Sequence, residues 1–219
     1  MTAYDTYPVE VAGVQRDLRL FEIKPGVRIA ILNILGDTEL VSAVSRALAE
    51  RLNEYKPDVL VTAEAKSIPL AHALSAVMDL PSVVLRKSYK PYMGDALQSE
   101  TLSITTGKPQ TLFLDEKDRE LVQGQRVALI DDVISTGSTL QGMRLIMHKA
   151  GAEVVAEAAI FTEGDRAQWH DIIALGHLPV WVEQKSHWVW KSKTPGITLA
   201  FAFMAGDYSH SSRSFWVSS

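Results

Sequence analysis

The chain of 219 residues contains no cysteine. Disulfide bonds, thiolate metal sites and thiol nucleophiles are therefore excluded together. The chain also lacks an uninterrupted apolar run of the roughly 18 residues that a membrane-spanning helix needs. Its first residues, MTAYDTYPVEVAG, have neither a basic start nor an apolar core, so they do not resemble a secretory signal peptide. We therefore expect a cytoplasmic protein with no membrane partner.

An excess of positive charge is also missing. The chain has 22 Lys and Arg against 26 Asp and Glu, which gives a formal net charge of -4. This balance provides no general attraction to nucleic acid, so no nucleic-acid partner is expected. Neither a Walker loop nor the glycine fingerprint of dinucleotide-binding proteins is present. The six histidines have no metal-ligand spacing. We expect structural roles for them, with His177 on a loop.

Apolar runs and helical spacing alternate along the middle of the chain. Runs typical of buried strands lie at residues 27–35, 57–63, 81–86, 124–132 and 153–161. Helical spacing of apolar residues is found at residues 37–55, 67–80 and 138–151. This alternation predicts an α/β fold with a mainly parallel central sheet flanked by helices.

The two ends of the chain differ from this middle part. We expect an N-terminal arm at residues 1–26, one main domain at 27–183 and a C-terminal extension at 184–219. The extension contains three of the five Trp and alternates in places, as in ITLAFAF. Packing on its own domain is the simpler interpretation of this extension. Its aromatic content also suits a subunit contact.

The segment VALIDDVISTGST, residues 127–139, combines two features that each need a ligand. Asp131 and Asp132 follow a buried apolar run, and a Ser/Thr/Gly loop then leads into a helix. Free backbone N–H groups and the helix dipole at such a helix start favour a phosphate group. The carboxylates would repel that phosphate unless they bind sugar hydroxyls or a divalent cation. A phosphorylated ribose satisfies these demands together.

The same segment resembles the donor-binding signature of the type I phosphoribosyltransferases. The resemblance implies that Asp131 and Asp132 bind the ribose hydroxyls of 5-phosphoribosyl 1-pyrophosphate (PRPP). It also implies Mg²⁺ as cofactor, bound through PRPP and water, with Asp131 and Asp132 as its candidate protein contacts. The 5-phosphate would lie in the loop that consists of Ser135, Thr136, Gly137, Ser138 and Thr139. Many members of the family have a second glycine where this chain has Ser138, whose N–H is still available.

Two upstream segments resemble the pyrophosphate-binding parts of the adenine branch of this family. The segment VTAEAKSIPLAHALS resembles the pyrophosphate loop, and LRKSYKPYM resembles the basic segment after the next strand. The resemblance implies that Lys87 takes part in catalysis together with Asp131 and Asp132. Residues 88–110 would form a flexible hood loop over the reacting centre. The implied pyrophosphate-binding residues are Ala65, Lys66, Ser67, Arg86 and Lys87.

The resemblance implies a homodimeric enzyme of purine salvage that transfers 5-phosphoribose from PRPP to an adenine-like base. One departure concerns the base: adenine-specific members have a glutamate in the hood loop where this chain has Thr105. Xanthine, hypoxanthine, guanine or a non-purine acceptor therefore remain open. The alternative function is a regulatory protein that senses PRPP or a nucleotide on the same fold. The first 26 residues are too short for an added helix-turn-helix module, which argues against DNA binding. A phosphate-binding α/β hydrolase is a weaker third possibility, because it does not explain the two aspartates.

Overall fold

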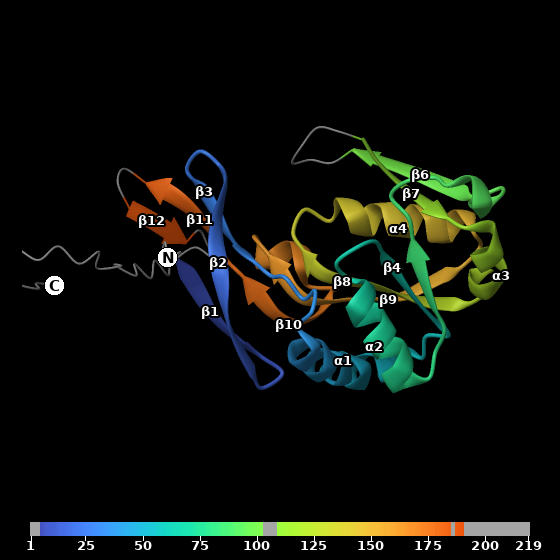
Figure 1. The fold of residues 1–219 in the computed structure, drawn as a ribbon, viewed down its shortest axis with the longest axis horizontal. Coiled ribbons are helices and arrows are strands. Elements are labelled where there is room, and N and C mark those ends of the chain that lie inside the picture. The colour runs from blue at the N-terminus through green and yellow to red at the C-terminus, as the bar shows by residue number, and fades with distance from the viewer. Residues whose placement is uncertain (1–4, 103–108, 185–186, 191–219) are drawn as a thin grey trace, which may run out of the picture.

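The computed structural model describes residues 5–102, 109–184 and 187–190. Two five-stranded sheets form its frame (Figure 1). One has the strand order β10-β9-β8-β4-β5, and the other has the order β1-β2-β3-β11-β12. A separate two-stranded hairpin, β6-β7, packs beside helix α4.

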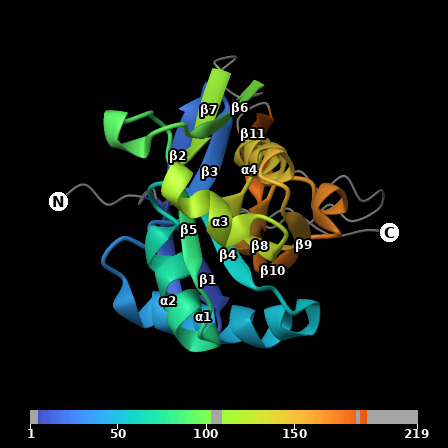
Figure 2. The same ribbon diagram turned by 90° about the vertical axis from the view of Figure 1, so that its right-hand side faces the viewer.

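The first sheet is parallel throughout. Its strands are β4 (Val59–Ala63), β5 (Ser82–Leu85), β8 (Arg126–Ile134), β9 (Glu153–Glu163) and β10 (Ile173–Leu178). Helices α1 (Thr38–Leu52) and α2 (Ile68–Met78) cover one face, and α4 (Ser138–Lys149) covers the other (Figure 2). This arrangement confirms the predicted parallel α/β sheet, and it places the carboxyl ends of all five strands at one edge. Among the described residues, no helix combines the length and apolar character that crossing a bilayer requires.

The second sheet is antiparallel and includes a strand that the sequence pattern placed differently. Its strands are β1 (Thr6–Val11), β2 (Val14–Lys24), β3 (Val27–Ile31), β11 (Val180–Gln184) and β12 (His187–Trp190). The predicted strand at 27–35 is too long, because the chain leaves the sheet after Ile31 and buries Leu32 and Ile34 in the core. β3 pairs with β2 and β11, so it is not a strand of the parallel sheet. An apolar run reports burial, but it does not report the partner strand.

The hairpin lies within and beyond the segment expected as a hood loop. β6 (Leu97–Leu102) and β7 (Pro109–Leu114) pair with each other, and the short helix α3 (Arg119–Val122) follows. Ser99 donates a hydrogen bond to the carbonyl of Gly142 in α4 at 2.9 Å, which ties β6 to that helix. Thr105 and the rest of residues 103–108 lie outside the described residues, as do residues 191–219 of the expected C-terminal extension.

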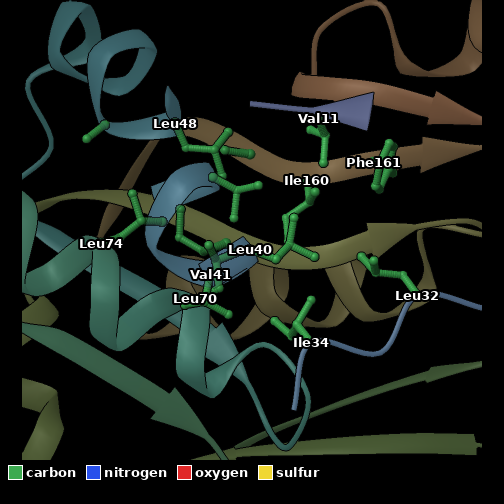
Figure 3. Close-up of a cluster of buried hydrophobic side chains, with 14 of the residues drawn as sticks. Val11, Leu32, Ile34, Leu40, Val41, Leu48, Leu70, Leu74, Ile160 and Phe161 are labelled. Atoms are coloured by element: carbon green, nitrogen blue, oxygen red, sulfur yellow. The ribbon is translucent and has the colours of Figure 1, made fainter. Parts of the chain in front are cut away.

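One apolar core joins α1 and α2 to the parallel sheet and to the antiparallel sheet. Leu48, Leu70 and Leu74 are fully buried between the helices and the strands (Figure 3). Val11 and Phe161 belong to the same cluster and come from the two different sheets. Burial of each such side chain stabilises the fold by about 1.5–3 kcal/mol. The antiparallel sheet is therefore held against the carboxyl edge of the parallel one.

Asp37 connects the antiparallel sheet to α1 by two interactions. Its side chain accepts a hydrogen bond from the N–H of Leu40 at 3.1 Å and so caps the helix. It also forms an ion pair with Arg16 of β2, in which Nε and Oδ2 are 2.8 Å apart. This guanidinium lowers the pKa of the Asp37 carboxyl.

We expect Asp37→Ala to lower the free energy of unfolding by about 1 kcal/mol, since loss of a helix cap costs about 0.5–2 kcal/mol. Asp37→Asn keeps a capping oxygen and should cost less. Because the pKa of Asp37 is lowered in the fold, its ionic contribution is present at neutral pH and is lost in acid, as the pH falls through the folded pKa. Urea unfolding at pH 7 measures both variants. Equal stability of wild type and Asp37→Ala would contradict the capping role.

Candidate functional site

Asp131 and Asp132 lie near the end of β8, at the carboxyl edge of the parallel sheet. The preceding residues Val127, Leu129 and Ile130 are fully buried, which explains why the strand occupies the middle of the sheet. β8 continues past the aspartates to Ile134, whose partner on β9 is Thr162. The two carboxyl groups are thus held on a strand, with rigid neighbours on both sides.

The loop between β4 and α2 contacts both aspartates directly. The hydroxyl of Ser67 donates to Asp131 Oδ1 at 2.7 Å and accepts from the backbone N–H of Asp132 at 3.2 Å. Lys66 Nζ lies 3.1 Å from Asp132 Oδ2, and it also donates to the carbonyl oxygen of Leu32 at 3.1 Å. Two segments that are about 65 residues apart in the sequence therefore form one charged cluster.

The Asp131 carboxyl has an unusual pKa in this cluster. Burial, and after it the neighbouring charge of Asp132, together raise this pKa to about 7. The hydrogen bond from Ser67 acts in the opposite direction, because it favours the ionised form. A ligand that brings hydroxyl donors or a cation to this carboxyl would favour ionisation in the same way.

The expected phosphate loop directly follows β8. Gly137 has a φ of 74°, a left-handed conformation, and α4 begins at the next residue. A Cβ atom on Gly137 would lie 3.0 Å from the ring of Trp169, so the ring closes one side of the loop. The Thr136 and Ser138 hydroxyl groups are 3.1 Å apart and hydrogen-bonded. Residues 133–140 and Asp131 line one hollow at the N-terminus of α4, which can take an anion.

Glu64 organises the two expected pyrophosphate segments. Its carboxylate accepts a hydrogen bond from the backbone N–H of Lys87 at 2.5 Å, and it lies 2.6 Å from Nε of Arg86. The β4–α2 loop and the segment after β5 are thereby joined, and the Lys87 side chain is left exposed. Ala65 is exposed on the same loop. None of the described contacts joins Arg86 or Lys87 to the aspartates.

Three further residues near this edge carry no recognisable motif in the sequence. His177 was expected on a loop, but it lies in β10, because the run IALGHL pairs with β9. Trp169 donates from its indole N–H to the carbonyl oxygen of Glu163 at 2.8 Å. Glu163 itself is the last residue of β9 and is only 7% exposed. A carboxylate at the end of an apolar strand was the only sequence signal for this group.

The chain matches the family model for the phosphoribosyl transferase domain over residues 32–183. Among curated proteins it is 32% identical to a xanthine phosphoribosyltransferase of Chloroflexus aurantiacus over 173 residues, which cover 75% of this chain and 81% of that protein. It is 30% identical to the purine biosynthesis transcriptional activator PurR of Lactococcus lactis over 155 residues, which cover 71% of this chain. The matched residues cover 55% of that regulator, so this chain spans about half of its length.

The fold is similar to solved adenine phosphoribosyltransferases. The structure from Thermoanaerobacter pseudethanolicus has a TM-score of 0.61 at 22% identity and covers 73% of this chain and 95% of its own. The enzyme from Giardia lamblia has the same TM-score at 18% identity and covers 73% and 93%. At these identities the likeness concerns the fold.

The raised pKa of Asp131 predicts that Asp131→Asn stabilises the protein above neutral pH. The folded state keeps the Asp131 proton up to about pH 7, whereas the unfolded chain releases it near pH 4, so wild-type stability falls as the pH rises between these values. We expect Asp131→Asn to have a higher Tm at pH 8 by a few degrees, since about 1 kcal/mol shifts Tm by about 2–4 °C at this size. At pH 5 the wild type and Asp131→Asn should have the same Tm. A difference that does not change between pH 5 and pH 8 would refute the shifted pKa.

Proposed function

Because the chain belongs to the phosphoribosyl transferase domain family, we propose that it transfers the 5-phosphoribosyl group of PRPP to a purine base and releases pyrophosphate. The observation that carries this proposal is the junction of the two aspartates with Ser67 and Lys66, beside the hollow that begins α4. Carboxylates for a sugar diol and backbone donors for a phosphate lie next to each other there. Asp131 itself lines that hollow, so a ligand with both groups could contact the carboxylate and the loop at once.

In the proposed complex each segment has a separate task. Asp131 and Asp132 accept hydrogen bonds from the ribose hydroxyls and offset positive charge that develops on the sugar ring. The loop of Ser135, Thr136 and Gly137, with Ser138 and Thr139 in the first turn of α4, donates to the 5-phosphate. The pyrophosphate is bound by Ala65, Lys66, Ser67, Arg86 and Lys87.

Binding of PRPP requires a rearrangement of the cluster. Lys66 and Ser67 are paired with the aspartates, so the ribose hydroxyls must replace the Ser67 donor and the pyrophosphate must compete for Lys66. Lys87 needs no such exchange, because its side chain is exposed and extends from a backbone that Glu64 fixes. Donor binding would therefore replace the Ser67–Asp131 hydrogen bond and the Lys66–Asp132 ion pair by similar contacts to PRPP.

Mg²⁺ fits this site only together with the donor. Among the described residues, no group of three His, Cys, Asp or Glu side chains could hold a metal ion. Asp131 and Asp132 would be the protein contacts of an ion held mainly by PRPP and water. When bound, Mg²⁺ would neutralise charge on the leaving pyrophosphate.

The match to PurR favours a second candidate function, the sensing of PRPP or a nucleotide without efficient transfer. Both functions use the same donor site. They differ in whether a base reacts with the bound donor. Homodimer formation and adenine as the base remain predictions from the family resemblance, and a cytoplasmic location remains a prediction from the sequence.

The test is incubation of the purified protein with PRPP, Mg²⁺ and a panel of adenine, hypoxanthine, guanine and xanthine. We expect pyrophosphate and one nucleoside monophosphate to be formed. No product with any base, while calorimetry still detects PRPP, would favour the sensor.

The donor site has its own test in the double variant Asp131→Asn with Asp132→Asn. PRPP affinity should fall at least 100-fold, because loss of charge-assisted hydrogen bonds costs about 1.5–3 kcal/mol each. The fold should remain intact by circular dichroism. Asp58→Asn serves as a matched control, since Asp58 precedes β4 at the opposite edge of the sheet. Unchanged PRPP affinity in the double variant would exclude this site.

A further inference from the structure

Glu163 is a buried carboxyl group that has no hydrogen-bond donor among the described residues. It lies at the carboxyl edge of the parallel sheet, on the strand next to the one that carries Asp131 and Asp132. It is 7% exposed. Burying an unpaired carboxylate destabilises a fold, so a position of this kind indicates a function outside the packing of the core.

Lys66 does not satisfy this carboxyl group. Its ammonium is close enough to favour the ionised form of Glu163, but its contacts are with Asp132 and with the carbonyl oxygen of Leu32. Among the described residues no cation lies within ion-pair distance of Glu163. Burial therefore dominates and raises the pKa of Glu163 to about 7.

The backbone on both sides of Glu163 is fixed by side chains from other segments. His177 Nε2 lies 3.1 Å from the carbonyl oxygen of Gly164, which can only accept, so this nitrogen carries the proton. His177 Nδ1 then accepts from the hydroxyl of Thr162 at 2.9 Å. Trp169 holds the carbonyl oxygen of Glu163 itself. Thr162, Glu163 and Gly164 are thus anchored one after another, which presets the position of the carboxyl group.

Other charged groups near this turn do not replace Glu163. Burial, and after it the charge of Arg166, lower the pKa of His177, and both its nitrogens already have hydrogen-bond partners. Asp165 and Arg166 follow the turn and act on His177 by their charge. The carboxylate of Asp132 forms an ion pair with the ammonium of Lys66. Asp131 accepts a hydrogen bond from Ser67 and, in the proposed complex, from the ribose. Glu163 is thus the carboxyl group at this edge that has no donor among the described residues.

Trp169 also links this turn to the expected phosphate loop. Its ring lies against Gly137, and its N–H is bonded to the carbonyl oxygen of Glu163. The carboxyl group and the hollow that begins α4 are therefore positioned by one side chain. A ligand held in the hollow by its phosphate would have a defined position relative to Glu163.

We propose that Glu163 is a catalytic residue that accepts the imidazole N–H proton of the purine base. This inference rests on the proposed transferase function. In the reaction a ring nitrogen of the base forms a bond to C1 of the ribose, and the C1–O bond to pyrophosphate breaks with its electron pair leaving on the pyrophosphate oxygen. The base would then carry an excess proton, which passes to the Glu163 carboxylate. A carboxylate with a pKa near the working pH is suited to this transfer.

The test compares wild type, Glu163→Gln and Glu163→Asp with the base that wild type uses, between pH 5.5 and pH 9. Wild-type kcat, measured at saturating PRPP, should rise with pH and level off above about 7, because the carboxylate of Glu163 is the active form. Bound ribose hydroxyls favour the ionised form of Asp131, so the raised pKa of Asp131 should not shape this profile. Glu163→Gln should lose about 100-fold or more in kcat, and its profile should lack this rise. Glu163→Asp should have a lower kcat that still rises with pH, because the shorter side chain retains a carboxyl group but holds it farther from the base.

A purely structural role has different consequences. Glu163→Gln should bind PRPP as wild type does and should melt no lower at pH 8, since an amide avoids burial of a charge. Glu153→Gln is the matched control at the opposite, exposed end of β9 and should leave kcat unchanged. Wild-type turnover with an unchanged profile in Glu163→Gln would overturn this inference alone. An inert wild type would overturn the proposed function and, with it, the role of Glu163.

Discussion

Two adjacent carboxyl groups at the end of a buried strand repel each other, and the rest of the site is arranged around this repulsion. Ser67 bridges the side chain of Asp131 and the backbone of Asp132, and Lys66 compensates the charge of Asp132. The raised pKa of Asp131 further reduces this repulsion, because a protonated Asp131 carries no charge. The site is thus stabilised by internal contacts, which a sugar diol, a pyrophosphate or a cation would replace in the proposed complex.

The supporting contacts run between strands and loops that are distant in the sequence. Glu64 joins the β4–α2 loop to the backbone of Lys87 after β5. Trp169 joins the turn after β9 to Gly137. All these segments leave the same edge of the parallel sheet, where open α/β sheets bind their ligands. The antiparallel sheet packs against this edge through the core shared by Val11, Leu32 and Phe161.

The family membership and the fold are confirmed, and they fit both an enzyme and a sensor. Relatives at similar identity include a xanthine phosphoribosyltransferase and a transcriptional activator of purine biosynthesis. A sensor and an enzyme need the same donor contacts. An enzyme additionally needs a group that manages the proton of the base. Glu163 is unnecessary for sensing a donor, and its buried and anchored position is therefore the feature that favours an enzyme.

The amino-acid sequence by itself determined the local structure of the proposed donor-binding segment, because the apolar strand, the two aspartates, the expected phosphate loop and the helix start are contiguous. Interactions between residues that are close in the sequence decide the conformation of such a segment. Gly137 and the start of α4 are found where the pattern predicted them. The strand at residues 27–35 was wrong in length and in sheet, since strand pairing depends on distant residues. Only the tertiary structure placed Lys66 and Ser67 on the aspartates, about 65 residues away, and isolated Glu163 as a buried group without a donor among the described residues. Burial and pairing of a charged side chain are properties of the packed strands around it, and the sequence near that side chain does not contain them.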